Sequence, residues 1–310
     1  MKVTVVFPGQ GTQYVGMGGV FSAHAHFGTA NNATGYDLKK MMLEGPVEDL
    51  KLTENTQPAI VTHSLIMFEH LKNILDKKNI KIERVLGHSV GEYAALAAAG
   101  VIEFSDAVKA VHYRGKYMQA AVPEGKGTMY AILKQSEAII REVCEAASNS
   151  LESVSPANFN EPNQIVISGN KAACETAIRL MGEKNNDRVK AIELQVSAPF
   201  HCALMKPAEQ KLKAVLDQMT FHPLKFPYVA NIDATEYGVD TSPSIIKENL
   251  LKQVCGSVLW THSIQKFSDD TLIIECGPGK VLAGLIKKIN PNLKVISLDT
   301  ETGFSKVEAL

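Results

Sequence analysis

The stretch VLGHSVGEY, residues 85–93, decides how the rest of the sequence is interpreted. A short apolar run ends there in the pattern G-x-S-x-G, and an alanine- and leucine-rich helical stretch follows until Gly100. Strand, tight turn and helix in this order are typical of a nucleophile elbow, which would hold Ser89 in a strained backbone conformation. Free backbone N–H groups at the helix start, that of Val90 among them, can stabilise an oxyanion. The alternative is an ordinary turn with a capping serine, and the context favours the nucleophile.

Composition excludes several function classes. The chain has 310 residues, is 45% hydrophobic and 21% charged, and carries a formal net charge of -1. Without a basic excess we expect no nucleic-acid partner. No apolar run approaches the roughly 20 residues of a membrane span, so we expect no membrane partner. The N-terminal apolar run stops at Pro8 and does not resemble a signal peptide. We expect a cytoplasmic protein, or one of an organelle matrix if a transit peptide has been removed.

The five cysteines are scattered and never form C-x-x-C. This usage is typical of a reducing compartment and predicts no cysteine-based zinc site.

Apolar runs of strand length alternate with stretches of helical period, which predicts an α/β chain. The middle of the chain differs, because it predicts the order β-α-β-β-α-β of a ferredoxin-like domain. We therefore expect a large α/β domain, residues 1–123 and 193–310, interrupted by a small insert, residues 124–192, with a cleft between them. The expected strands are residues 4–7, 84–86, 272–275 and 295–298 in the large domain, and residues 128–133, 153–157, 164–168 and 189–194 in the small one.

A serine nucleophile needs a base, and His201 is the best placed of nine histidines. It follows an expected strand, Pro199 keeps the chain extended before it, and a helical pattern begins after it. That position is the carboxyl edge of a sheet, as for Ser89. From the residues alone, a packing role for His201 is as open as a catalytic one. The other eight histidines lie in sequence contexts that do not favour a catalytic base: His24, His26, His63, His70, His88, His112, His222 and His262.

Arg114 interrupts the apolar face of the helical stretch at residues 106–121. Burying a guanidinium costs several kcal/mol unless the charge is paired. One explanation is a structural ion pair, for which Glu92 is the obvious partner. The other is a bidentate grip on a substrate carboxylate, which suits the planar fork of arginine. We favour the substrate.

A second glycine-rich turn, PGQG at residues 8–11, follows the first expected strand. It lacks both phosphate-loop patterns. A turn that presents the backbone N–H of Gln10 toward the serine is more consistent with the other motifs.

Six motifs together resemble one family. The sequence resembles malonyl-CoA:acyl carrier protein transacylases, the acyltransferases of fatty acid and polyketide synthesis, from residue 3 to about residue 290. The motifs are FPGQG (7–11), GHSVGE (87–92), RGKYMQ (114–119), SPANFN (155–160), APFHCALM (198–205) and GPGKVL (277–282).

The resemblance implies a fold and a role for each matching residue. The fold is an α/β-hydrolase-like domain with a ferredoxin-like insert. Ser89 is the nucleophile, His201 the base, and the backbone N–H groups of Gln10 and Val90 form the oxyanion hole. Arg114 holds the malonyl carboxylate, and a backbone carbonyl near Gln253 orients the histidine. The remaining substrate-binding residues border the cleft: Met118, Asn158, Asn160 and Phe200.

Two positions bear on how far the resemblance extends. The stretch at residues 18–35 is a little short and a poor helix former compared with the family. Phe200 precedes the histidine, as it often does in modular relatives selective for malonyl groups, whereas relatives that take methylmalonyl often have serine. One methyl group in a pocket is worth about 1–3 kcal/mol, so we expect a preference for malonyl.

The expected reaction is a ping-pong transfer of malonyl from malonyl-CoA to the phosphopantetheine thiol of acyl carrier protein. It needs no metal and no cofactor, and we expect a monomer. A serine esterase or thioesterase is the rival enzyme, but it would normally carry an acid between serine and histidine and a histidine near the C-terminus. A non-catalytic carrier-docking protein would be expected to have lost Ser89, His201 or Arg114, and all three are present.

Overall fold

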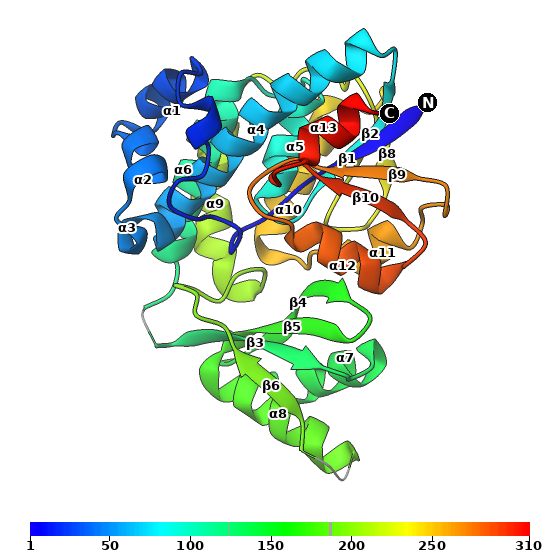
Figure 1. Ribbon diagram of the computed structural model, residues 1–310. Coiled ribbons are helices and arrows are strands. Elements are labelled where there is room, and N and C mark those ends of the chain that lie inside the picture. The colour runs from blue at the N-terminus through cyan, green and yellow to red at the C-terminus, as the bar shows by residue number, and fades with distance from the viewer. Residues whose placement is uncertain (124, 186–187) are drawn as a thin grey trace.

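The computed structural model describes residues 1–123, 125–185 and 188–310, and within them the chain forms two β-sheets (Figure 1). The larger sheet has six strands in the order β10-β9-β1-β2-β7-β8. Neighbours from β10 to β7 pair in parallel, and β8 pairs antiparallel with β7. The strands are β1 (Lys2–Phe7), β2 (Lys81–Gly87), β7 (Tyr228–Val229), β8 (Glu236–Tyr237), β9 (Leu272–Glu275) and β10 (Lys294–Ser297).

The smaller sheet is antiparallel, with the order β4-β5-β3-β6. Its helices α7 (Glu137–Ala146) and α8 (Lys171–Asn185) lie together on the face turned away from the larger sheet (Figure 1). This is the predicted β-α-β-β-α-β arrangement. The strands are β3 (Gly127–Leu133), β4 (Val154–Glu161), β5 (Gln164–Asn170) and β6 (Lys190–Glu193). The proposed insert limits of 124 and 192 stay a prediction, and residue 124 lies outside the described residues.

Helices cover the larger sheet on both sides (Figure 1). On one side the long helix α4 packs against α6, and α6 also contacts α1 and α9. The remaining helices surround the sheet and the chain ends. The bounds are α1 (His26–Thr34), α2 (Leu38–Glu44), α3 (Val47–Lys51), α4 (Thr53–Lys77), α5 (Gly91–Ala98), α6 (Phe104–Gln119), α9 (Lys206–Leu216), α10 (Pro243–Cys255), α11 (Trp260–Ile264), α12 (Val281–Ile289) and α13 (Gly303–Glu308), with 3-10 turns at Gly19–Phe21 and Ala203–Met205. No helix of the described residues is both long and apolar enough to cross a membrane.

The predicted fold class, an α/β-hydrolase-like domain with a ferredoxin-like insert, is confirmed. Several elements differ from the sequence-based expectation, among them the short strands β7 and β8, which were not predicted. Helix α4 was not predicted, because the polar residues of its first turns conceal its apolar face; most of them are nevertheless buried. The stretch expected to be a poor helix former contains α1, which buries Phe27 and Ala30. Packing against neighbouring helices outweighs weak intrinsic propensity there. Strand β4 runs four residues further than predicted, to Glu161.

Two glycines allow α5 to cross directly over the central strands. A Cβ on Gly87 would lie 2.0 Å from the carbonyl group of Gly91, and a Cβ on Gly91 would lie 2.2 Å from the carbonyl oxygen of Phe7. Both distances are far inside van der Waals contact. The pattern G-x-S-x-G therefore brings the start of α5 against the ends of β1 and β2.

The smaller sheet is hydrogen-bonded to the large domain through β4. The amide of Phe159 donates to the carbonyl of Val258 at 3.0 Å, and the amide of Val258 donates to the carbonyl of Ala157 at 2.8 Å. These bonds hold β4 beside the loop that follows α10. Asn158 and Asn160 alternate with Ala157 and Phe159 along β4, and they lie at the border between the two sheets.

We expect Gly91→Ala to reduce the free energy of unfolding by about 3 kcal/mol or more, because its methyl group meets backbone that cannot move aside. Urea denaturation checks this. Gly284→Ala, in the middle of α12, is the matched control, since a Cβ there meets nothing within 4 Å. The control should stabilise by about 0.5–1 kcal/mol. Equal effects of the two substitutions would contradict the steric explanation.

Candidate active site

Ser89 occupies the turn between β2 and α5 with a backbone φ of 53°. This left-handed conformation is strained for a residue with a side chain and confirms the predicted elbow geometry. Asn231, two residues after β7, stabilises the turn from the side. Its Oδ1 accepts from the Ser89 amide at 2.8 Å, and its Nδ2 donates to the Gly87 carbonyl at 2.6 Å.

His201 lies next to the serine, as predicted, and also has a left-handed backbone, with φ 59°. Its Nε2 is 2.7 Å from Ser89 Oγ, and its Nδ1 is 2.9 Å from the backbone carbonyl of Gln253. A carbonyl can only accept, so Nδ1 carries the proton and the lone pair of Nε2 faces the serine hydroxyl. Burial, with Arg114 nearby, lowers the pKa of His201 to about 3. The imidazole is therefore neutral and ready to accept a proton.

Arg114 extends from α6 to the same place and is almost completely buried. Its Nη1 donates to Gln57 Oε1 at 2.8 Å, and its Nη2 donates to Gln253 Oε1 at 2.9 Å and to Ser89 Oγ at 3.2 Å. Burial lowers the pKa of Arg114, while Tyr93 and Glu92 raise it again. Arginine remains a cation under such conditions.

The ion pair with Glu92, considered above as the structural alternative, is not formed. Among the described residues the guanidinium contacts amide and hydroxyl oxygens and no carboxylate within ion-pair distance. Glu92 instead accepts from Gln253 Nε2 at 2.6 Å and from the amide of Asn231 at 3.4 Å. The Gln253 side chain thus lies between the guanidinium and the buried Glu92 carboxyl, and no contacting carboxylate neutralises the cation.

Gln253, on α10, connects all of these groups. Its backbone carbonyl accepts from His201, its side-chain oxygen accepts from Arg114, and its side-chain nitrogen donates to Glu92 and to the Ser89 carbonyl at 2.9 Å. Burial raises the pKa of Glu92 to about 8, although its hydrogen bonds and Arg114 act in the opposite direction. The resemblance to the family implied a backbone carbonyl near Gln253 as the histidine's partner, but no role for the Gln253 side chain.

These groups open into a pocket of about 390 Å³. Gln253 is fully buried and is not among the residues that line this pocket. Asn160 Oδ1 is 2.8 Å from His88 Nε2, so His88 points toward the small domain and away from the serine proton, as expected. The pocket is lined by the nine other predicted site residues, Gln10, Ser89, Val90, Arg114, Met118, Asn158, Asn160, Phe200 and His201.

Two backbone N–H groups near the serine have no acceptor among the residues that the structure describes. Within the described residues, no backbone hydrogen bond involves the amides of Gln10 or Val90, and both residues line the pocket. The Gln10 side chain is fixed by donating to Thr53 Oγ1 at 3.2 Å. Two unused donors beside a nucleophile are the arrangement that an oxyanion requires.

Two residues of the site were missed from the sequence. Gln57 lies in the first turns of α4, a helix that was not predicted, and Asn231 follows β7, a strand of two residues. A polar residue just after an apolar pair is a weak signal at best. The position of β7 next to β2 in the sheet gives Asn231 its role.

Comparison with known proteins agrees with this geometry. Residues 4–272 match the acyl transferase domain family. The chain belongs to this family. The malonyl CoA-acyl carrier protein transacylase of Haemophilus influenzae is 40% identical over 314 residues, which is 99% of this chain and 98% of the relative.

Solved structures of related proteins are also similar to this acyltransferase. An acyl-carrier-protein S-malonyltransferase from Burkholderia pseudomallei superposes with a TM-score of 0.90, at 40% identity over 100% of both chains. A malonyl-transacylase solved in complex with the acyl-carrier protein of a type II polyketide synthase superposes with a TM-score of 0.89, at 36% identity over 100% of both chains. The whole acyltransferase chain, insert included, is therefore covered by its relatives.

The buried acid of this acyltransferase generates a prediction about pH. Glu92 has its pKa raised from 4.5 to about 8, so the folded chain keeps a proton that the unfolded chain loses. This contribution to stability is present below pH 4.5 and is lost as the pH rises toward 8. When the pH rises from 6.5 to 8, the free energy of unfolding of the wild type should fall by roughly 2 kcal/mol relative to that of Glu92→Gln.

Urea denaturation of both proteins across this range measures the difference. This pH range excludes acid conditions. There the lowered pKa values of His201 and His63 make the free energy of unfolding rise with pH, which is the opposite of the Glu92 effect. Glu145→Gln, at an exposed position on α7, should keep the wild-type dependence. Parallel curves for Glu92→Gln and wild type would contradict the assignment.

Proposed function

We propose that this acyltransferase transfers the malonyl group of malonyl-CoA to the phosphopantetheine thiol of an acyl carrier protein, through a malonyl ester on Ser89. The transfer supplies extender units for fatty acid or polyketide synthesis. The observation that carries the proposal is the buried cation of Arg114, which lies 3.2 Å from Ser89 Oγ and pairs with no carboxylate of the described residues. The names of the relatives support it.

In the first half-reaction, His201 Nε2 accepts the Ser89 proton while Oγ attacks the thioester carbonyl carbon. The carbonyl oxygen becomes negative and is held by the N–H groups of Gln10 and Val90. When the carbon–sulfur bond breaks, His201 gives its proton to the departing sulfur. Free CoA and malonyl-Ser89 result.

In the second half-reaction, the carrier thiol gives its proton to His201, and its sulfur attacks the ester carbonyl carbon. The same two N–H groups hold the oxyanion. The bond to Oγ then breaks, and Ser89 takes back a proton from His201. The Gln253 carbonyl keeps the imidazole in one tautomer throughout. This chemistry requires no metal and no cofactor beyond the two substrates.

Arg114 has two effects in this scheme. Its guanidinium binds the malonyl carboxylate, which keeps the acyl group oriented across both half-reactions. The carboxylate in turn neutralises a cation that helps to lower the pKa of His201. Substrate binding thus raises the basicity of the histidine when the proton has to move.

The rest of the pocket suits a short acyl chain and an extended thiol arm. Met118 and Phe200 contribute apolar surface, and Asn158 offers an amide from β4. Asn160 lines the pocket beside it, with its amide bonded to His88 and Gln164. The Phe200 ring fills space that an added methyl group would need. We therefore propose malonyl over methylmalonyl, by the 1–3 kcal/mol that one methyl is worth. A monomeric state and a cytoplasmic location stay predictions.

The proposal is tested by mixing the protein with malonyl-CoA alone and recording its intact mass. We expect a stable malonyl adduct on Ser89 and one equivalent of free CoA. Ser89→Ala should form no adduct, whereas Ser105→Ala, at an exposed position on α6, should behave as wild type. An esterase would release malonate continuously, and a carrier-docking protein would gain no mass. Either outcome would overturn the proposal.

The second prediction concerns the acyl group. In Arg114→Ala, kcat/KM for malonyl-CoA should fall on the order of 10²–10³-fold, because a buried carboxylate loses its partner, while that for acetyl-CoA should not fall. The ratio of the two is informative even if part of the variant is unfolded. Arg179→Ala, on the exposed face of α8, controls for loss of an arginine. An unchanged ratio would contradict this prediction and would indicate that the role of Arg114 is structural.

A further inference from the structure

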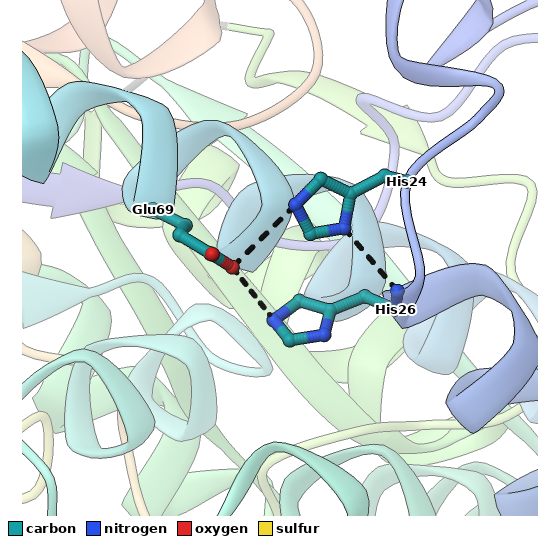
Figure 2. Close-up of side chains that lie close together, drawn as sticks. All are labelled: His24, His26 and Glu69. Carbon is teal, nitrogen blue, oxygen red and sulfur yellow. Dashed lines mark hydrogen bonds and ion pairs between the residues drawn. The ribbon is translucent and has the colours of Figure 1, made fainter.

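Two histidines and a glutamate converge at a place outside the acyltransferase pocket (Figure 2). His24 lies just before α1, His26 is the first residue of α1, and Glu69 lies on α4. Both imidazoles point an Nε2 at the same carboxylate oxygen, Glu69 Oε2, at 3.5 Å from His24 and 3.1 Å from His26. This segment is also where the sequence departs from the pattern of its family.

The separations match those between the ligands of a small tetrahedral ion. Zinc binds imidazole nitrogen and carboxylate oxygen at about 2.0–2.2 Å, so two ligand atoms on one ion lie about 3.3 Å apart. The two nitrogen-to-oxygen distances agree with this value, and all three ligand atoms lie within 4.8 Å of one another. Side-chain rotation has only to bring the two histidine nitrogens somewhat closer.

Neighbouring contacts already orient both rings. The His26 ring stacks on Phe104 with centroids 4.0 Å apart and planes inclined by 15°. His24 Nδ1 accepts from the His26 amide at 3.2 Å, which directs Nε2 toward Glu69. For Nε2 to bind a metal, the His24 proton must move to Nδ1, so this long hydrogen bond would break. One weak bond is a small loss against a metal–ligand bond.

The charges suit a cation. Neutral imidazoles are the form that binds metals. The ion pairs of Glu69 among the described residues are those with these two histidines, so no lysine or arginine competes for the carboxylate. Glu69 is half exposed, which leaves a path from solvent and a fourth position for water. This is the only such group of three found among the described residues.

We propose that His24, His26 and Glu69 bind one divalent transition-metal ion, for which zinc is the natural choice given two imidazoles and a carboxylate. The ion links the segment before α1 to α4. Through the His26–Phe104 stack it also restrains the start of α6, the helix that carries Arg114. None of its three ligands lines the acyltransferase pocket, so its effect is on the stability of the helical layer.

The test is zinc titration of untagged protein by calorimetry, with one site per chain expected. Loss of even an outer-shell partner weakens metal sites 10–100-fold, so loss of a ligand should weaken binding by about 100-fold or more. The variants are His24→Ala, Glu69→Gln and His26→Phe, the last of which keeps a ring on Phe104. His222→Ala removes an exposed histidine elsewhere and should bind as wild type.

Thermal unfolding gives an independent readout. Zinc at 100 times its dissociation constant should raise the Tm of the wild type on the order of 5 °C, reversibly on chelation, and should not do so in the three variants. Cobalt substitution should give the intense visible absorption of a tetrahedral ion. Failure of the wild type to bind zinc below millimolar concentration, or equal binding in the ligand variants, would overturn the proposal.

Discussion

A buried guanidinium that pairs with no carboxylate of the described residues is the constraint around which the site is organised. Removing Arg114 from water carries a large desolvation cost, and an ion pair would be the usual compensation. Here the compensation comes from the side-chain oxygens of Gln57 and Gln253 and from Ser89 Oγ. Neutral oxygens hold the cation in position without cancelling its charge. The charge therefore remains available to an acid that enters the pocket.

The proposed nucleophile and the proposed base are held by backbone conformations that the fold imposes. Ser89 and His201 both have positive φ, and both lie where the chain turns between elements. Such conformations persist only when the surroundings determine them. For the serine, the surroundings are the close crossing of α5 over β1 and the side-chain oxygen of Asn231. For the histidine, they are the backbone carbonyl of Gln253. Gln253 thus joins Arg114, His201 and Ser89 in one hydrogen-bonded group.

The sequence allowed much of this to be predicted. G-x-S-x-G after an apolar run indicated the elbow because few residue types tolerate a crossing that close. The arginine stood out because it interrupted an apolar helical face. His201 was harder: from the residues alone a packing role was as open as a catalytic one, and the resemblance to a family decided. Gln57 was missed because it belongs to a helix that begins with polar residues, and Asn231 was missed because it follows a strand of only two residues. Neither element gives a clear signal in the sequence.

What the sequence by itself determined is local: the strand–turn–helix around Ser89, the β-α-β-β-α-β order of the smaller domain, and the residue types that the chemistry needs. What only the tertiary structure decided is which polar groups meet. The pairing of Arg114 with two glutamines, and not with Glu92, depends on where α4 and α10 lie relative to α6. Hydrogen bonds extend only about 3 Å, so partners 57 and 139 residues apart along the chain are fixed by packing, which local sequence patterns do not specify.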